Sequence, residues 1–153
     1  MTKVIKYALA IALLFGLVNP TVMHQIAKAP NVSADDIFCL AKNIYHEARG
    51  EPLQGQKAVA QVTINRTKAE GFPSRICDVV YQHKQFSRTL QPHLKVTDSE
   101  SWNRSLLLAR QALTNGIPGF EEFTALYFHA KHVKPYWRKK HKVYAHIGNH
   151  IFY

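Results

Sequence analysis

The sequence predicts an α+β fold, with helices first and a small antiparallel sheet near the C-terminus. Apolar residues recur at helical spacing in segments 37–48, 56–67 and 102–113. Short runs rich in aromatic and β-branched residues, typical of strands, are confined to positions beyond 122. The 153 residues, 46% of them apolar, suit one domain with a substantial core.

The first 30 residues are expected to form an export signal or a weak signal anchor. Lys3 and Lys6 precede an apolar run at 7–18, which is too short for an ordinary membrane-spanning helix. The triplet at 27–29 has the small-x-small form of a cleavage site, although Pro30 follows it. The alternative is a buried N-terminal core helix. We therefore expect an exported protein of the periplasm or cell envelope, with residues 31–153 as its catalytic domain.

A first helix is predicted between Ser33 and Gly50. Ser33 followed by Asp36 resembles a capping box, and Gly50 is expected to be a C-terminal glycine cap. At about 100° per residue, His46 falls opposite the apolar stripe and Glu47 falls on its edge. The stripe consists of Ile37, Leu40, Ala41, Ile44, Tyr45 and Ala48.

Glu47 is the candidate general acid. A carboxyl group held where a packed helix gives way to a loop is partly desolvated and still reaches a substrate, as general acid catalysis requires. The alternative is an ordinary surface carboxylate paired with Lys42 or Arg49, since most helix glutamates are solvated.

The second helix, predicted over residues 56–67, carries apolar residues nearly all round and is expected to be central. Asn65 lies on its apolar side and needs hydrogen-bond partners. These are either structural groups or a ligand, which makes Asn65 a candidate substrate-binding residue.

A third helix is predicted to start at a capping box of Thr97 and Glu100 and to end near residue 115, before Gly116. Strands are predicted at 123–128, 143–147 and 151–153, with a turn at Gly148 and Asn149 between the last two.

Cys39 and Cys77 are the two cysteines of the chain. In an exported protein they most simply form one disulfide, which ties the first helix to the segment after Pro73. Cys39 points away from the apolar stripe, so another segment must cover that face if the bond forms. Two reduced, buried thiols are the alternative, and neither cysteine has the setting of a catalytic nucleophile.

Three separated motifs carry a resemblance to a known family. They are YHEARGEPLQGQKAVAQVTINR at 45–66, FPSRICDVVYQHKQFS at 72–87 and IGNHIFY at 147–153. In this order they resemble the SleB/CwlJ-type cell-wall hydrolases, the spore cortex-lytic enzymes and their bacterial and phage relatives, over residues 35–153. The resemblance implies a peptidoglycan glycosidase with a lysozyme-like core, in which Glu47 matches the catalytic glutamate.

The resemblance also implies lytic transglycosylase chemistry. One glutamate protonates the MurNAc-GlcNAc bond oxygen at muramic acid C1, then deprotonates that sugar's 6-hydroxyl, which closes a 1,6-anhydro ring. Glu47 must then start protonated, and burial beside Ile44 favours this form. Ordinary glycosidases use two carboxylates, and Glu51 is the candidate second one. Otherwise Glu51 is expected to position the next helix by accepting bonds from its N-terminal N–H groups.

The net charge of +10 suits an anionic partner, either an envelope polymer or nucleic acid. Much of it lies in residues 131–142, where basic and aromatic residues alternate; this pattern binds nucleic acid or sugars, and the resemblance favours sugars. Tyr127 and His129 are expected to hydrogen-bond the glycan, and Trp137 to stack on a sugar or else to pack into the core. We expect a monomer without nucleic acid, touching membrane only through its N-terminal segment.

No cofactor and no metal are expected. His46 and Glu47 resemble the start of a zinc motif, but residue 50 is Gly, so the second ligand is missing. Four later histidines have zinc-like spacings without an accompanying carboxylate or cysteine: His129, His132, His146 and His150. Two other classes stay open: a glycan-binding module without catalysis, and a metal-dependent cell-wall amidase or peptidase.

Overall fold

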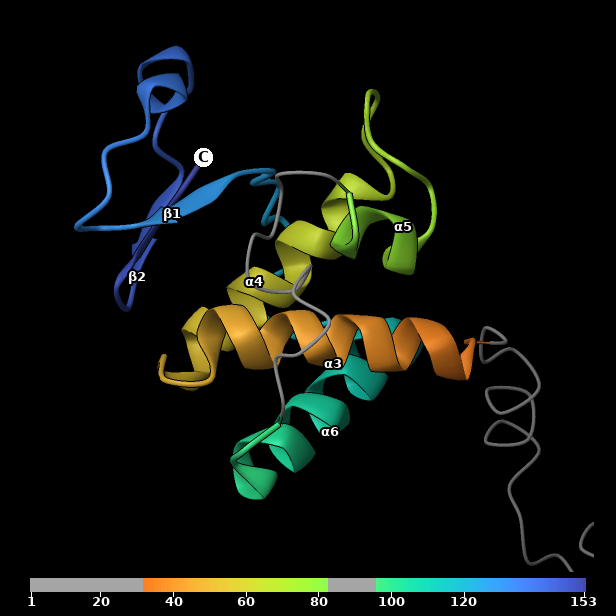
Figure 1. Cartoon of the computed structure of the whole chain (residues 1–153). Coiled ribbons are helices and arrows are strands. Elements are labelled where there is room, and N and C mark those ends of the chain that lie inside the picture. The colour runs from red at the N-terminus through yellow and green to blue at the C-terminus, as the bar shows by residue number, and fades with distance from the viewer. Residues whose placement is uncertain (1–31, 83–95) are drawn as a thin grey trace, which may run out of the picture. The chain divides into compact units, whose positions relative to one another are not determined.

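The computed structural model describes residues 32–82 and 96–153, which form a helical part followed by a small sheet (Figure 1). The elements, in order, are α3 Ala34–Ala48, α4 Leu53–Arg66, α5 Ile76–Val80, α6 Ser99–Asn115, β1 Phe128–Ala130, the 3₁₀ helix η1 Tyr136–Lys140, β2 Ala145–Ile147 and β3 His150–Phe152. This order confirms the predicted α+β class. The predicted export signal at 1–30 lies outside the described residues.

Helix α3 lies at the centre of the helical part and contacts α4, α5 and α6 (Figure 1). Its predicted start is confirmed, because the Ser33 hydroxyl accepts a hydrogen bond from the Asp35 N–H at 3.1 Å. The expected glycine cap is wrong. Arg49 ends the helix in a right-handed conformation, and Gly50 is not among the glycines with positive φ. The chain turns instead through a bond from the Glu51 N–H to the Ala48 carbonyl at 2.9 Å.

Helix α4 begins at Leu53, earlier than predicted, because Pro52 serves as its N-cap and its carbonyl accepts bonds from the Gly55 and Gln56 N–H groups. Its buried residues are spread round the helix, which confirms the expected central position: Gly55, Gln56, Ala58, Val59, Ala60, Val62, Thr63 and Arg66.

The predicted disulfide between Cys39 and Cys77 is present and joins α3 to α5, with the two Cα atoms 5.2 Å apart. Cys39 is buried, with 5% of its surface exposed. The cover that the sequence required for this face of α3 is therefore supplied by α5, which contacts both α3 and α4.

The N-cap of helix α6 lies one residue later than predicted. Asp98, not Thr97, is the N-cap, and its carboxylate accepts from the Ser101 N–H at 3.0 Å. The backbone N–H groups of Thr97 and Asp98 both donate to the Tyr45 hydroxyl at 3.1 Å, which holds this end against α3. The predicted end is confirmed at Asn115, followed by Gly116 at φ 77°.

The three strands form an antiparallel sheet in the order β1-β3-β2, with Ile151 opposite both His129 and His146. The strand predicted over 123–128 is mostly wrong, since β1 starts at Phe128. Phe123 and Ala125 bury their side chains in the core, and their carbonyls accept from a side chain of α4 rather than from a neighbouring strand. The core also receives Phe152 from β3.

Within residues 32–82 and 96–153, none of the helices is both long and apolar enough to cross a membrane.

Candidate active site

Glu47 lies in the last turn of α3, where it is half-buried and its Oε1 atom is enclosed. It follows Asn43 by one helical turn, so the two side chains leave the same face of α3. The Asn43 amide donates to Thr63 Oγ1 at 2.9 Å, which shows that this face is turned toward α4. The carboxyl group therefore stands at the corner where α3 gives way to the loop before α4.

The two cations that the sequence offered as partners of Glu47 have other contacts. Lys42 Nζ lies 3.5 Å from the Tyr81 hydroxyl and 5.2 Å from the centre of its ring. The Arg49 guanidinium donates to the Tyr45 carbonyl at 3.4 Å and lies 4.9 Å from the centre of the Tyr45 ring. Both long side chains are thus engaged along α3 and α5.

The position of His46 differs from expectation. It was predicted on the side opposite the apolar stripe, yet only 5% of it is exposed, and its ring meets the Tyr45 ring edge-on at 5.0 Å. The reason is that α3 is covered by α4, α5 and α6 together, so more than one stripe is buried. A single amphipathic stripe underestimates the burial of a central helix.

Glu51 links the loop between α3 and α4 to the sheet through hydrogen bonds. Its Oε2 accepts from the Asn149 N–H at 2.7 Å, and its Oε1 accepts from Asn149 Nδ2 at 3.2 Å. The sequence predicted bonds from the N-terminus of α4, but the carboxylate is used by the β2–β3 turn, 98 residues away. Because Gln56 Nε2 donates to the Glu51 carbonyl at 2.9 Å, the same residue is also tied to α4 through its backbone.

Two glycines make room for this contact. Gly148 has φ 55°, and a Cβ atom there would lie 2.1 Å from Glu51 Oε2. A Cβ at Gly55 would lie 3.0 Å from Glu51 Cβ. The turn can approach the carboxylate only because residue 148 has no side chain. The corner that carries Glu47 and the end of the sheet are therefore one connected unit.

Asn65 is engaged in structural contacts. Its amide donates to the Phe123 carbonyl at 2.6 Å and to the Ala125 carbonyl at 3.1 Å, and its Oδ1 accepts from Gln61 Nε2 at 2.8 Å. Both amide hydrogens are thus used within the protein. These contacts support the structural alternative for Asn65 over binding of a ligand.

Arg66 is a buried residue that sequence reasoning missed. Its Nε donates to the Leu126 carbonyl at 2.7 Å, and its guanidinium lies 5.2 Å from the centre of the Phe72 ring. Burial lowers the pKa of Arg66 to about 10, partly opposed by Tyr127. Together with Asn65 it fixes the chain that enters β1. A basic residue in the last turn of a helix that carries apolar residues nearly all round is the sequence signal for such a buried cation.

Tyr127, His129 and Trp137 lie together, while their expected role in binding a glycan stays a prediction. Trp137 lies 5.6 Å from Tyr127 and 5.7 Å from His129, measured between ring centres. His141 and Tyr153 complete this ring cluster. Because Trp137 meets rings on several sides, its contacts support packing over a free stacking platform.

The imidazole of His129 is held at both nitrogens. Nδ1 lies 2.9 Å from the Ala130 carbonyl, and Nε2 lies 2.9 Å from the Tyr153 hydroxyl. A carbonyl only accepts, so the Nδ1 atom carries a proton, and in the neutral ring Nε2 accepts from the Tyr153 hydroxyl. Only 9% of His129 is exposed.

Tyr136, in the stretch where basic and aromatic residues alternate, has 81% of its surface exposed. It precedes Trp137 in η1. Neighbouring residues of a helix point in different directions, so when Trp137 packs inward the ring of Tyr136 is displayed. In the sequence, the signal for this arrangement was the adjacent pair of aromatic residues Tyr136 and Trp137.

Among the described residues, no group of three His, Cys, Asp or Glu side chains is arranged to hold a metal ion. His150 lies buried in the sheet beside the Phe128 ring, at 5.1 Å. Burial lowers the pKa of His150, against an opposing attraction from Glu51.

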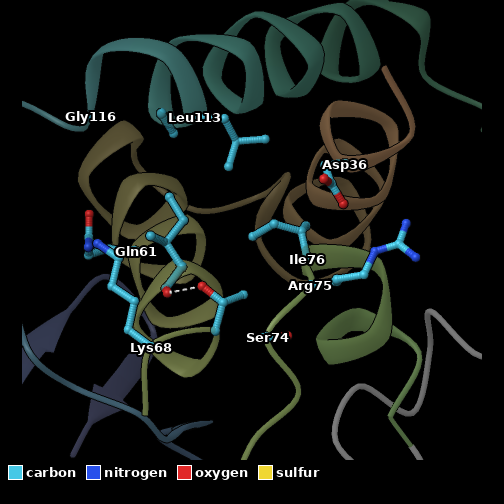
Figure 2. A pocket seen from close by; sticks show the side chains of 11 residues that line it. Asp36, Gln61, Lys68, Ser74, Arg75, Ile76, Leu113 and Gly116 are labelled. Atoms are coloured by element: carbon cyan, nitrogen blue, oxygen red, sulfur yellow. Dashed lines mark hydrogen bonds between the residues drawn. The ribbon is translucent and has the colours of Figure 1, made fainter. Parts of the chain in front are cut away.

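A pocket of about 460 Å³ lies elsewhere, between α3, α4, α5 and α6 (Figure 2). Ile76 and Leu113 form part of its apolar wall, and Asp36, Lys68 and Arg75 stand at its edge (Figure 2). Neither Glu47 nor any residue of the sheet lines it. We therefore locate the candidate site by the carboxyl group at the corner and not by this pocket.

Solved structures define the class of domain to which this arrangement belongs. The catalytic domain of the germination-specific lytic transglycosylase SleB from Bacillus anthracis superposes with a TM-score of 0.65 at 30% identity, covering 80% of this chain and 97% of that domain. The catalytic domain of Bacillus cereus SleB gives a TM-score of 0.64 at 31% identity, covering 81% and 94%. The predicted fold is thereby confirmed.

Residues 50–153 match the model of the cell wall hydrolase family, and the chain belongs to this family. Spore cortex-lytic enzymes are similar to it: that of Oceanobacillus iheyensis is 32% identical over 78% of this chain, and that of Halalkalibacterium halodurans is 33% identical over 84%. The chain spans only 42% and 38% of the length of these two relatives.

Glu47 lies just before the residues matched by the family model, but within the longer alignments. The spore cortex-lytic enzyme of Bacillus cereus aligns with 88% of this chain at 30% identity. A contiguous stretch of that length cannot leave residue 47 out of a chain of 153.

Proposed function

We propose that the protein cleaves the glycan strands of peptidoglycan as a lytic transglycosylase, with Glu47 as its catalytic acid and base. The proposal rests on the position of Glu47, which is half-buried in the last turn of α3. We call this end of α3 the braced corner, because the nearby Glu51 is hydrogen-bonded to Asn149 of the β2–β3 turn. The likeness to a solved domain that is itself a lytic transglycosylase supports the proposal.

The reaction needs one group that first gives and then takes a proton. Protonated Glu47 would donate to the oxygen that leaves muramic acid C1, and the resulting carboxylate would take the proton of that sugar's 6-hydroxyl. The hydroxyl oxygen then bonds to C1 and closes a 1,6-anhydro ring. No water is consumed, and the glutamate returns to its protonated form. This scheme requires Glu47 to be protonated at the start.

The contacts of Glu51 support a mechanism with one carboxylate. A two-carboxylate glycosidase needs the second group free to attack the sugar or to activate water. Both oxygens of Glu51 accept hydrogen bonds from Asn149. A carboxylate used in this way is a weak candidate for a nucleophile, so Glu51 is better described as a positioning residue.

The proposal extends to location and partners. Peptidoglycan lies outside the cytoplasm, so the protein would be exported, with residues 1–30 as signal or weak anchor. It would act as a monomer on glycan strands and touch the membrane only through that segment. The net charge of +10 favours contact with anionic wall polymers.

The test compares wild type with Glu47→Gln on purified cell-wall sacculi. The amide keeps the shape but cannot donate a proton, so cleavage should fall on the order of a hundredfold or more. Glu70→Gln, at an exposed position after α4, is the matched control and should cleave normally.

Mass spectrometry of the released fragments then identifies the reaction. Anhydro ends are lighter by one water than the products of hydrolysis. Residual cleavage by Glu47→Gln above a tenth of wild type would refute the assignment of Glu47. Cleaved peptide bonds in place of glycan bonds, with inhibition by a chelator, would instead indicate a metal-dependent amidase or peptidase.

A further inference from the structure

A strongly basic segment connects β1 to β2 and is not used by the proposed reaction. We call residues 131–142 the basic arm. It carries six of the 20 Lys and Arg residues of the chain and none of its ten Asp and Glu residues. The six are Lys131, Lys134, Arg138, Lys139, Lys140 and Lys142.

The basic arm is fastened to the sheet at both ends. The Lys131 N–H donates to the Asn149 carbonyl at 2.8 Å, and the Tyr144 N–H, just beyond the arm, donates to the Phe152 carbonyl at 2.7 Å. The Tyr144 hydroxyl also donates to the Glu122 carbonyl. A segment held in this way has its backbone fixed at both ends, which reduces the backbone conformational entropy lost when a ligand binds.

Trp137 anchors the middle of the arm. Its ring lies within 6.0 Å, between ring centres, of four other rings in the ring cluster. Tyr136 and the lysines at 139 and 140 are exposed at the same place. Because Trp137 packs inward, the ring of its neighbour Tyr136 is exposed to solvent beside Lys139 and Lys140.

The arm is continuous with the candidate active site. Lys131 is bonded to the carbonyl of Asn149, and the N–H of Asn149 is bonded to Glu51 at the corner that carries Glu47. A polymer lying across that corner therefore reaches the start of the arm by way of the β2–β3 turn.

We propose that the basic arm is a second binding surface for the peptidoglycan strand, outside the bond that is cleaved. Its lysines bind the carboxylates of the stem peptides, and Tyr136 stacks on a sugar ring. This inference rests on the proposed function. Continuity with the braced corner favours a wall strand over a lipid surface as the partner. The surface holds the strand electrostatically while Glu47 acts elsewhere on it.

The first test measures binding to sacculi in a Glu47→Gln background, where the wall stays intact. Adding Lys139→Ala and Lys140→Ala should weaken binding about tenfold at low salt, because two exposed cations each contribute a modest attraction. The difference should disappear at high salt, where exposed charges are screened. The control pair is Lys68→Ala with Arg110→Ala, which removes the same charge from exposed positions of the helical part. An equal loss in the control pair would show a general charge effect and overturn the proposal.

The second test separates the ring from the charges. Tyr136→Ala should weaken binding severalfold at low and high salt alike, since stacking is not screened. It should leave the melting temperature unchanged, because the ring is 81% exposed. Tyr81→Ala, on α5, is the aromatic control and should bind normally. Unchanged binding by Tyr136→Ala would overturn the role given to that residue.

The partner is identified by changing the wall and by offering a membrane. Sacculi whose carboxylates have been amidated should bind as weakly as the Lys139→Ala, Lys140→Ala protein binds to untreated wall. Equal binding to amidated and untreated sacculi would overturn the proposal. So would tighter binding, dependent on the same lysines, to vesicles of phosphatidylglycerol. These binding measurements do not require cleavage. An inactive wild type would therefore refute the proposed function, while the binding data would still test the role of the basic arm.

Discussion

At the scale of single residues, the corner of the domain depends on a carboxylate that does no chemistry in the proposed reaction. Glu51 accepts two hydrogen bonds from Asn149, and the bare Gly148 lets them form. Both bonds lie at exposed positions, where water can replace a lost partner, so losing them costs only the modest net value of each bond. The effect of a change at Glu51 should therefore depend on what the new side chain can accept.

We expect Glu51→Ala to lower the free energy of unfolding by about 1 kcal/mol, because it removes both hydrogen bonds to the exposed Asn149. Glu51→Gln keeps a carbonyl oxygen and should be milder, as should Asn149→Ala, which keeps the backbone donor. Urea unfolding of the three proteins checks this order. Complete loss of cleavage in Glu51→Gln with unchanged stability would instead restore a two-carboxylate mechanism.

His150 makes a prediction about pH. Burial lowers its pKa in the folded protein, Glu51 opposes this shift and His129 adds to it. As pH falls below the unfolded value of about 6.5, the unfolded chain binds the proton more readily than the folded one. Stability from neutral His150 is therefore present above about pH 6.5 and is lost as pH falls from there toward the lowered pKa.

The measurement is the melting temperature of wild type and of His150→Phe between neutral and mildly acidic pH. The phenyl ring still packs beside Phe128 but cannot titrate. Wild type should lose more of its melting temperature on acidification than the variant loses. Parallel curves for the two proteins would show that another group controls acid stability.

At the scale of elements, the ring cluster decides how η1 and the strands pack. The Trp137 ring lies within 6.0 Å, between ring centres, of the rings of Tyr127, His129, His141 and Tyr153. The two neighbours in η1 therefore have opposite roles. Trp137 packs η1 onto the ring cluster, and Tyr136 is exposed to solvent.

We expect Trp137→Ala to lower the free energy of unfolding by about 1–3 kcal/mol, less than for a fully buried tryptophan because Trp137 is half-buried. Tyr136→Ala is the neighbouring control and should change stability by less than about 0.5 kcal/mol. Thermal and urea unfolding measure both. A Trp137→Ala protein of normal stability that no longer binds glycan would make Trp137 the sugar platform after all.

At the scale of the whole molecule, the helical part and the sheet are joined by contacts between residues far apart in sequence. Asn65 and Arg66 of α4 bind the segment before β1, and Glu51 binds the turn before β3. The disulfide adds a covalent link from α3 to α5. It acts mainly by restricting the unfolded chain.

For a closed loop with a sequence separation of 38 residues, replacing Cys39 and Cys77 by Ala should cost about 4 kcal/mol in the chain-entropy model. Chemical unfolding of the double variant measures this loss. Intact mass after alkylation, with and without reduction, checks the bond itself in protein recovered from outside the cytoplasm. Two thiols alkylated without reduction would contradict the linkage there.

Local signals in the sequence were sufficient for the three long helices, the late sheet, the Ser33 cap and the disulfide pair, but they did not predict the short helix α5. The catalytic role of Glu47 stays a prediction. Helix periodicity, capping side chains and glycine turns act within a few residues, so they can be read without the fold. Tertiary contacts decided the rest. Residues 123–126 stay irregular because Asn65 and Arg66 bind the carbonyl groups of Phe123, Ala125 and Leu126. His46 is buried because three helices enclose α3. The partner of Glu51 lies 98 residues away, and no short-range pattern identifies a contact whose geometry exists only once the sheet has packed on the corner.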